Sequence, residues 1–221
     1  MKPVLATLLA LGAAACGAEA RAVRVPPPAA APADAGSGPQ AIVLAGGCFW
    51  GMQGVFEHVK GVLSAVAGYD GGPRRFANYE MVSTGTTGHA ESVKITYDPG
   101  QISLGDILRI YFSVATDPTQ LDRQFPDEGP QYRGEIFYEN TGQRDLAQSY
   151  IAQLTAAHVF RGRIATKVAP DSGFFPAEGY HQNYLEKHPD APYIVSYDLP
   201  KLRDLKALFP DRWRAAPVLA S

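Results

Sequence analysis

Residues 41–59, AIVLAGGCFWGMQGVFEHV, join an apolar run to a helical pattern through two adjacent glycines. The run 41–47 is short and apolar, as in a buried strand, and the segment 48–59 has the mixed spacing of a helix. Glycine allows the tight turn that such a junction needs. The pattern therefore predicts a buried strand that turns sharply into a helix, with Cys48 in the first helical turn.

Cys48 is one of two cysteines in the chain, and the other, Cys16, falls in the N-terminal leader. A lone thiol cannot belong to a disulfide framework, which makes Cys48 a candidate nucleophile. Free N–H groups and the helix dipole favour a thiolate at a helix N-terminus, so we expect a lowered pKa for Cys48. The alternative interpretation is a small buried apolar side chain.

The first 40 residues differ in composition from the rest of the chain. Residues 1–20 contain one lysine, an apolar run and then small residues, which is typical of a signal peptide. Cleavage is expected either near Ala18–Ala20 or just before Cys16, and we favour the second, lipoprotein-type site, which makes Cys16 a lipid anchor. Residues 21–40 are rich in Pro and Ala and are expected to form a disordered linker. The protein is then exported, and lies in the periplasm or is anchored in a membrane facing it.

Strand and helix patterns interleave along one expected domain, residues 41–214, without a Gly-rich phosphate motif or a regular βαβ repeat. This order predicts an α+β two-layer sandwich, in which helices pack on a mixed β-sheet with a ferredoxin-like core. Segment 70–89 has the composition of a functional loop with a short extended part. Beyond the first strand and helix, the patterns predict strands at 61–69, 90–98, 133–139 and 163–170, and helices at 102–115, 141–157, 177–189 and 198–210.

Glu91 lies in an alternating segment and shares the parity of the apolar residues Val93, Ile95 and Tyr97. It is therefore expected on the core face of a strand. Burial disfavours the charged form of a carboxyl, so Glu91 can stay protonated near neutral pH. The alternative interpretation is a strand-end side chain that lies in solvent.

The charge and histidine patterns argue against two classes of site. The formal net charge is −2, which gives no reason to expect a nucleic acid partner. The five histidines are residues 58, 89, 158, 181 and 188. They show no close paired spacing with cysteine or acidic ligands, so no metal site is expected.

Six short motifs occur in a fixed order between residues 41 and 195. They are GGCFWG (46–51), GTTGHAES (85–92), YDP (97–99), DPTQLDRQ (117–124), GPQYRGEIFY (129–138) and AEGYHQNYL (177–185). In order and spacing they resemble the peptide-methionine (S)-S-oxide reductases, the A-type methionine sulfoxide reductases. The absence of any cysteine after Cys48 is similar to the one-cysteine subgroup of that family.

This resemblance implies the reduction of the S epimer of methionine sulfoxide, free or in proteins, through a sulfenic acid on Cys48. Cys48 and Glu91 match the family's nucleophile and its acid, which protonates the departing oxygen. The other matching positions are expected to bind substrate: Phe49 and Trp50 as walls of the pocket for the methyl group, Tyr79 and Tyr132 on the oxygen, and Asp127 beside the rest of the substrate. Tyr180 and His181 match a motif that we interpret as supporting hydrogen bonds, and His89 is placed to orient Glu91 or to lie in a solvent-side turn.

The resemblance also implies the partners. No cofactor is expected, and the sulfenic acid is expected to be reduced by an external thiol, either a small one or a thioredoxin-like protein. The implied substrates are oxidised methionine-containing proteins, and the expected export places them in the cell envelope. The enzyme is expected to be a monomer.

Four positions depart from the usual family pattern. Thr116 replaces a common His, Pro130 and Gly134 replace Thr and Ser around the QYR sequence, and Gly179 replaces an acidic or small residue. None of them removes a reacting group, but Pro130 removes a backbone donor next to Tyr132.

Two other functions remain open from the residues alone. The aromatic residues with an acid could form a cage for a methylated cation in a binding lipoprotein, in which Cys48 is idle. A one-cysteine thiol peroxidase or disulfide reductant would explain the thiol. That second function leaves the methyl-sized aromatic pocket and Glu91 without a role.

Overall fold

The computed structural model describes residues 22–30 and 38–220 and contains a six-stranded sheet in the order β7-β6-β1-β3-β2-β8. All neighbouring strands are antiparallel except β6 and β7, which are parallel. A separate hairpin pairs β4 with β5. The strands are β1 (Gln40–Ala45), β2 (Val62–Asp70), β3 (Ala90–Tyr97), β4 (Arg123–Gln124), β5 (Asp127–Glu128), β6 (Glu135–Tyr138), β7 (Lys167–Pro170) and β8 (Phe175–Pro176).

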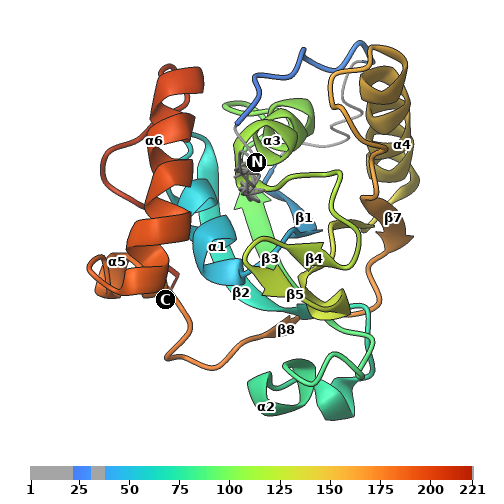
Figure 1. Cartoon of the computed structure of the whole chain (residues 1–221). Helices are drawn as coiled ribbons and strands as arrows, with labels where there is room; N and C mark the ends of the chain where they lie inside the picture. The colour runs from blue at the N-terminus through green and yellow to red at the C-terminus, as the bar shows by residue number, and fades with distance from the viewer. Residues whose placement is uncertain (1–21, 31–37, 221) are drawn as a thin grey trace, which may run out of the picture.

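Helices α1, α3, α4 and α6 bury side chains in one core with Ile42 and Leu44 of β1. In Figure 1, α5 and α6 lie to the left of the sheet and α4 to the right. The helices are α1 (Phe49–Glu57), α2 (Tyr79–Val82), α3 (Leu104–Ile110), α4 (Thr141–Ala156), α5 (Tyr184–Lys187) and α6 (Leu199–Leu208). Short helical turns are η1 (Arg74–Phe76), η2 (Tyr111–Ala115), η3 (Pro130–Tyr132) and η4 (Ile194–Asp198). The expected α+β class, with helices packed on a mixed sheet, is confirmed.

The junction between β1 and α1 forms as the sequence predicts. Strand β1 lies between β3 and β6, so its side chains from Ile42 to Ala45 are fully buried. Helix α1 follows with Cys48 at its N-cap and buries nearly all of its residues. Because β1 is central and α1 covers the sheet, the start of α1 is fixed by the core on both sides.

Two helices begin at side-chain caps. Ser103 accepts a hydrogen bond from the N–H of Asp106 and caps α3. Asn140 accepts one from the N–H of Gln143 and caps α4. These caps explain why both helices begin close to their predicted positions.

Some expected elements differ from those observed. The loop 70–89 contains the short helix α2 and the turn η1 rather than an extended segment, and Asn78 caps α2 by accepting from the N–H of Met81. The helix expected over 177–189 is confined to α5, because the Ala177 N–H donates to the carbonyl of Ala67 on β2 and the Gln182 side chain bonds to the Ala67 backbone. Turns fill residues 179–183. Tertiary pairing overrides the local helical pattern there.

Residues 22–30 do not form the free linker expected of them. Val25 is fully buried, its N–H donates to Oγ of Ser113 at 3.2 Å, and its carbonyl accepts from Nε of Arg109 at 2.9 Å. The Tyr150 hydroxyl donates to the carbonyl of Pro26. In Figure 1 this blue segment runs over α3 towards α4. The core therefore begins before residue 41. Residues 1–21, which include the expected signal peptide and Cys16, lie outside the described part, as do residues 31–37.

The C-terminal tail also packs on the domain beyond the expected boundary at residue 214. The N–H of Val218 donates to the carbonyl of Glu57 at 3.0 Å, and the N–H of Ala220 donates to Oδ1 of Asn183 at 2.9 Å. These contacts fasten the tail to the end of α1 and the turn before α5.

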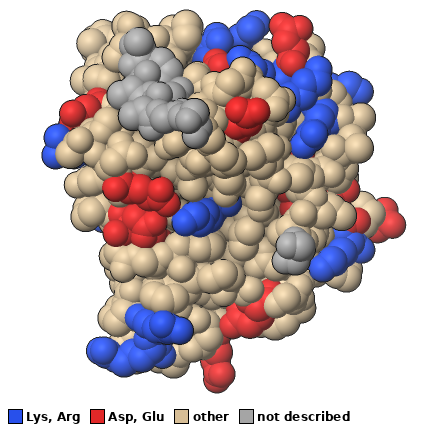
Figure 2. All heavy atoms as spheres, turned by 180° about the vertical axis from the view of Figure 1, so that it is seen from behind, with Lys and Arg blue, Asp and Glu red and all other residues tan. Residues whose placement is uncertain are grey.

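Among residues 22–30 and 38–220, no helix is both long and apolar enough to cross a bilayer. On the face seen in Figure 2, acidic and basic side chains are interspersed in small groups among uncharged ones. That face offers no broad surface of a single charge.

Candidate active site

Cys48 lies where β1 turns into α1, and its side chain is 9% exposed. The turn depends on Gly47, whose φ is +99°. A Cβ on Gly47 would lie 2.6 Å from Cγ of Gln124, so a larger residue is excluded by contact as well as by conformation. The glycine pair therefore lets the chain carry Cys48 to the start of the helix.

The pKa of Cys48 differs from the sequence-based expectation. Burial, and then the negative charges of Glu91 and Asp198, raise the pKa of the thiol well above its usual range, although a hydrogen bond from the N–H of Trp50 lowers it. The expected lowering is therefore wrong. The reason is that desolvation and nearby carboxylates outweigh the helix N-terminus. The substrate-free site holds Cys48 as a thiol.

Glu91 is buried beside Cys48, as the parity of its strand predicts. It lies on β3, is 3% exposed, and its Oε2 accepts a hydrogen bond of 3.0 Å from the N–H of Phe49. Burial raises the pKa of Glu91 to about 8, with smaller contributions from Asp127 and Asp198, against the lowering effect of the Phe49 N–H. At neutral pH this carboxyl is mostly protonated and can donate a proton.

The aromatic pair after Cys48 is held by other rings. Phe49 is 1% exposed, and its ring centroid lies 5.0 Å from that of His181. Trp50 is half-buried, stacks on Tyr184 with 3.8 Å between ring centroids, and meets Tyr193 edge-on at 5.8 Å. Both rings are therefore fixed in orientation next to the thiol.

His181 connects these rings through a hydrogen bond. The Nε1–H of Trp50 donates to Nδ1 of His181 at 3.1 Å. Burial lowers the pKa of His181, so the ring is neutral and carries its proton on Nε2. The expected supporting hydrogen bond at His181 is present, whereas the Tyr180 side chain is 60% exposed.

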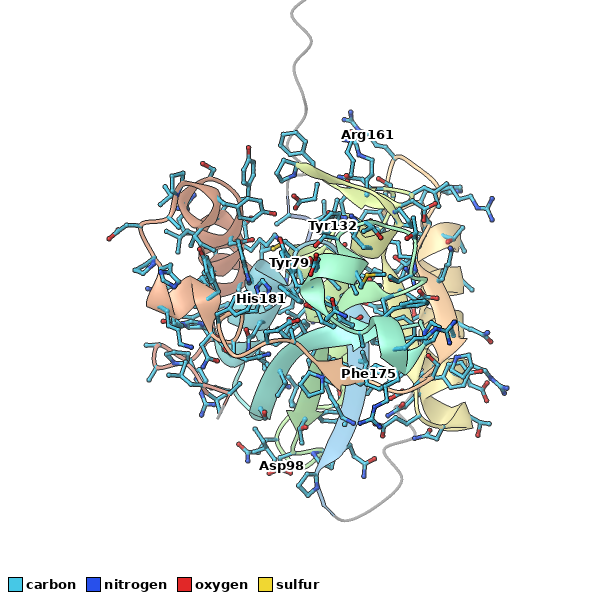
Figure 3. All side chains as sticks on the ribbon, turned by 90° about the horizontal axis from the view of Figure 1, so that it is seen from below. Tyr79, Asp98, Tyr132, Arg161, Phe175 and His181 are labelled. Carbon is cyan, nitrogen blue, oxygen red and sulfur yellow. The ribbon has the colours of Figure 1, made fainter. Side chains whose placement is uncertain are left out.

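Tyr79, Tyr132 and Asp127 come from three separate segments and meet at this site. Tyr79 is 36% exposed, and its ring centroid lies 4.5 Å from that of His181. Tyr132 is half-buried, and burial followed by the charges of Glu91 and Asp127 raises its pKa. Figure 3 shows Tyr79, Tyr132 and His181 close together, with Asp98 far from them. The structure thus gathers the other six predicted site residues around Cys48.

The sequence analysis missed Tyr193. Its hydroxyl donates a short hydrogen bond to Oδ2 of Asp127, and the same ring packs on the edge of Trp50. Tyr193 therefore links an expected substrate-binding carboxyl to an expected pocket wall. No sequence pattern identifies it, because Tyr193 lies outside the six motifs and 66 residues from Asp127 in the chain.

His89 does not bond to Glu91. It is 2% exposed, so the solvent-side alternative is wrong, and its Nε2 donates to the carbonyl oxygen of Pro73 at 3.1 Å. His89 thereby fastens the loop after β2 to the start of β3.

The four departures from the family pattern have simple structural settings. Pro130 is the first residue of η3, where a helical turn leaves its N–H unbonded, so the missing donor is no loss. Thr116 lies against Gly46, where an added Cβ would be 2.9 Å from the Thr116 hydroxyl oxygen. An added Cβ on Gly134 would lie 3.0 Å from Oγ1 of Thr166, and one on Gly179 would meet nothing within 4 Å.

No metal centre is formed by the residues that the structure describes, since no three His, Cys, Asp or Glu side chains are grouped to hold an ion. What the site contains is a thiol, a protonated carboxyl, tyrosine hydroxyls and an aromatic wall. Such a set can transfer a proton and carry out nucleophilic chemistry at sulfur.

Residues 40–212 match the model of the family described as peptide methionine sulfoxide reductase. The chain is 54% identical over 185 residues to the peptide methionine sulfoxide reductase MsrA 2 of Mesorhizobium japonicum, covering 84% of this chain and 95% of the relative. It is 45% identical over 166 residues to the MsrA of Thermus thermophilus, covering 75% and 93%.

Two solved structures have a similar fold. The methionine sulfoxide reductase A of Corynebacterium diphtheriae has a TM-score of 0.59 and 32% identity, covering 70% of this chain and 77% of that one. Mxr1 from Saccharomyces cerevisiae in reduced form has a TM-score of 0.62 and 30% identity, covering 69% and 87%. On its sequence, its fold and the residues gathered at Cys48, the chain belongs to the peptide methionine sulfoxide reductases of the MsrA type.

Proposed function

We propose that this enzyme reduces the S epimer of methionine sulfoxide, with Cys48 as the nucleophile and Glu91 as the acid. The observation that carries this assignment is the hydrogen bond of 3.0 Å from the Phe49 N–H to Glu91, which holds the carboxyl beside the residue that follows Cys48. A thiol and a proton donor are then available to one substrate sulfur and its oxygen.

The chemistry begins with both protons in place. Burial raises the pKa of Glu91 and of Cys48, so the resting site has a carboxylic acid and a thiol. Glu91 protonates the sulfoxide oxygen, and the resulting carboxylate takes the proton of the Cys48 thiol. The thiolate is therefore generated only when a substrate oxygen has accepted a proton.

The net reaction transfers one oxygen atom. A bond forms between Sγ of Cys48 and oxygen while the bond between the substrate sulfur and oxygen breaks. The substrate sulfur gains two electrons, and the Cys48 sulfur loses two and becomes a sulfenic acid. Glu91 ends the step protonated, so it is ready for the next turnover.

Three fixed groups distinguish the two epimers. Phe49 and Trp50 take the methyl group, whereas Glu91, Tyr79 and Tyr132 surround the oxygen. With the rest of the substrate directed towards Asp127, the three substituents on sulfur are assigned. The R epimer then cannot present its oxygen to Glu91 with its methyl group in the aromatic pocket.

Recycling uses a thiol from outside the chain, either a small thiol or a thioredoxin-like protein. Cys48 is the one free cysteine among the described residues, which supports an intermolecular route. We further propose that the substrates are oxidised proteins of the cell envelope and that the enzyme acts as a monomer, exported to the periplasm or anchored there through Cys16. The N-terminal sequence alone supports that location.

The test supplies blocked methionine-S-sulfoxide and methionine-R-sulfoxide separately, with dithiothreitol as reductant. We expect consumption of the S epimer only, and none by the Cys48→Ser variant. Equal consumption of both epimers would refute the assigned orientation, and activity of Cys48→Ser would refute the nucleophile. Binding of a methylated ammonium ion by Cys48→Ala, without turnover by the unaltered chain, would favour the aromatic cage instead.

A further inference from the structure

Asp198 is a fully buried carboxyl between η4 and α6. Its Oδ1 lies 3.4 Å from Nζ of Lys201, one turn further along the chain, and the Lys201 side chain is 20% exposed. Its Oδ2 is buried and has no hydrogen-bond partner among the described residues. A buried carboxyl with one unsatisfied oxygen is costly, so its location calls for a reason.

That location is the first turn of α1. A Cβ on Gly51 would lie 2.0 Å from Oδ1 of Asp198 and 2.9 Å from Nζ of Lys201. Only glycine therefore lets this pair approach the helix, and Gly51 follows Cys48 by three residues. The last glycine of the GGCFWG motif is explained by a contact with residues almost 150 positions away.

We infer that Asp198, packed on Gly51 and paired with Lys201, is a positioning residue whose charge balance controls the protonation of Cys48 and Glu91. The inference rests on the function proposed above, because it assigns a role in that reaction. Asp198 acts through the two reacting groups and does not itself touch the substrate.

Several charged and titratable groups interact with Asp198, so the charge of the Asp198–Lys201 pair affects their protonation. Besides Lys201 they are Asp127, Tyr193, Cys48 and Glu91. Burial raises the pKa of Asp198, and the Lys201 ammonium lowers it. Asp198 in turn adds to the effect of burial in raising the pKa of Cys48 and of Glu91. With both members charged, the pair contributes a net charge near zero beneath the helix.

Removing Asp198 makes the net charge of the pair positive, and removing Lys201 makes it negative. Asp198→Asn leaves a lone ammonium, which stabilises a thiolate on Cys48. Lys201→Met leaves a lone carboxylate, which destabilises the thiolate. A role limited to packing predicts something else, since both substitutions would loosen the same contact and change Cys48 in the same direction.

The experiment measures alkylation of Cys48 by iodoacetamide at pH 9, in the full chain without substrate, by mass spectrometry of the Cys48 peptide. Below the pKa of Cys48 the rate is proportional to the thiolate fraction. We expect Asp198→Asn to react faster and Lys201→Met more slowly, each by about tenfold, which corresponds to one pKa unit. The double variant should return towards the rate of the unaltered chain.

Asp211→Asn is the control, because it removes an exposed carboxyl just after α6 and should leave the alkylation rate unchanged. Equal rates for all variants, or shifts of the two single variants in the same direction, would overturn the inference. Circular dichroism identifies a variant that fails to fold, and the other single variant then decides by its own direction. The readout needs no turnover, so its outcome is separate from that of the proposed reductase activity.

The same variants should move the pH profile of turnover. Asp198→Asn favours ionised Glu91, so the fall of kcat/KM at alkaline pH should begin at a lower pH. Lys201→Met should shift this fall to a higher pH. An alkaline limb at the same pH in both variants would contradict the part of the inference that concerns Glu91.

Discussion

The backbone N–H of Phe49 donates a hydrogen bond of 3.0 Å to Oε2 of Glu91. This bond joins the first turn of α1 to β3 through one of the two carboxyl oxygens of Glu91. It also fixes the Glu91 side chain in one orientation, although burial raises the pKa of that carboxyl to about 8. Glu91 is thus an acid whose direction is set by the helix that carries the nucleophile.

Replacing Glu91 by glutamine should remove the proton donor and preserve the pocket. The amide oxygen can still accept from the Phe49 N–H, so KM for methionine-S-sulfoxide should change little. We expect kcat to fall by about 100-fold or more, the scale of general acid catalysis. Glu80→Gln, an exposed carboxyl on α2, is the matched control. An unchanged kcat would exclude Glu91 as the acid.

The pH profile should show the loss of this acid. Because the pKa of Glu91 is raised to about 8, the protonated form predominates below that pH and is lost above it. We expect kcat/KM to fall as pH rises through about 8, measured with excess dithiothreitol so that recycling does not limit the rate. In Glu91→Gln this fall of kcat/KM at alkaline pH should disappear. If the fall persists in that variant, a group other than Glu91 causes it.

Glu57 should make the fold less stable at alkaline pH. Both of its carboxyl oxygens are buried without hydrogen-bond partners among the described residues, and burial raises its pKa from 4.5 to about 8. The unfolded chain releases this proton at lower pH than the folded protein does, so stability falls as pH rises between these values.

The change in unfolding free energy caused by Glu57→Gln should therefore be more stabilising at pH 8.5 than at pH 5. We expect the two changes to differ by about 1 kcal/mol or more, which is roughly one pKa unit. Urea unfolding at the two pH values measures this difference. Glu80→Gln again controls for the loss of one carboxyl. An effect of Glu57→Gln that is equal at both pH values would mean that Glu57 is not protonated in the folded state.

Val25 tests whether the segment before the sheet belongs to the folded domain. Val25→Ala removes two methyl groups from a fully buried site and should cost about 2 kcal/mol of unfolding free energy. Val23 is 40% exposed, so Val23→Ala should change stability by less than about 0.5 kcal/mol. Equal, small effects of the two substitutions in urea unfolding would show that residues 22–30 do not pack on the domain in solution.

The recycling route predicts a stoichiometry. With excess methionine-S-sulfoxide and no reductant, a Cys16→Ser chain should release about one methionine per enzyme, because no second thiol can reduce the sulfenic acid. Dimedone should then label Cys48, as detected by mass spectrometry. Release of two methionines per chain, or a cross-link between Cys48 and another residue, would contradict a route that depends on an external thiol.

The sequence by itself determined the strand, the glycine turn, the helix and the place of Cys48 between them, because local periodicity and glycine conformation act over a few residues. It also placed Glu91 on the core face, since side chains alternate along a strand. The resemblance carried by the ordered motifs pointed to six further residues that the structure gathers around Cys48: Phe49, Trp50, Tyr79, Glu91, Asp127 and Tyr132.

Only the tertiary structure decided how those groups are charged and what holds them. The helix N-terminus alone favours a thiolate, but burial and the carboxylates of Glu91 and Asp198 reverse the direction of the Cys48 pKa. The contacts of Asp198 with Gly51 and of Val25 with Ser113 likewise join distant parts of the chain. Desolvation and charge effects sum over neighbours from many segments, and a linear sequence does not reveal which neighbours those are.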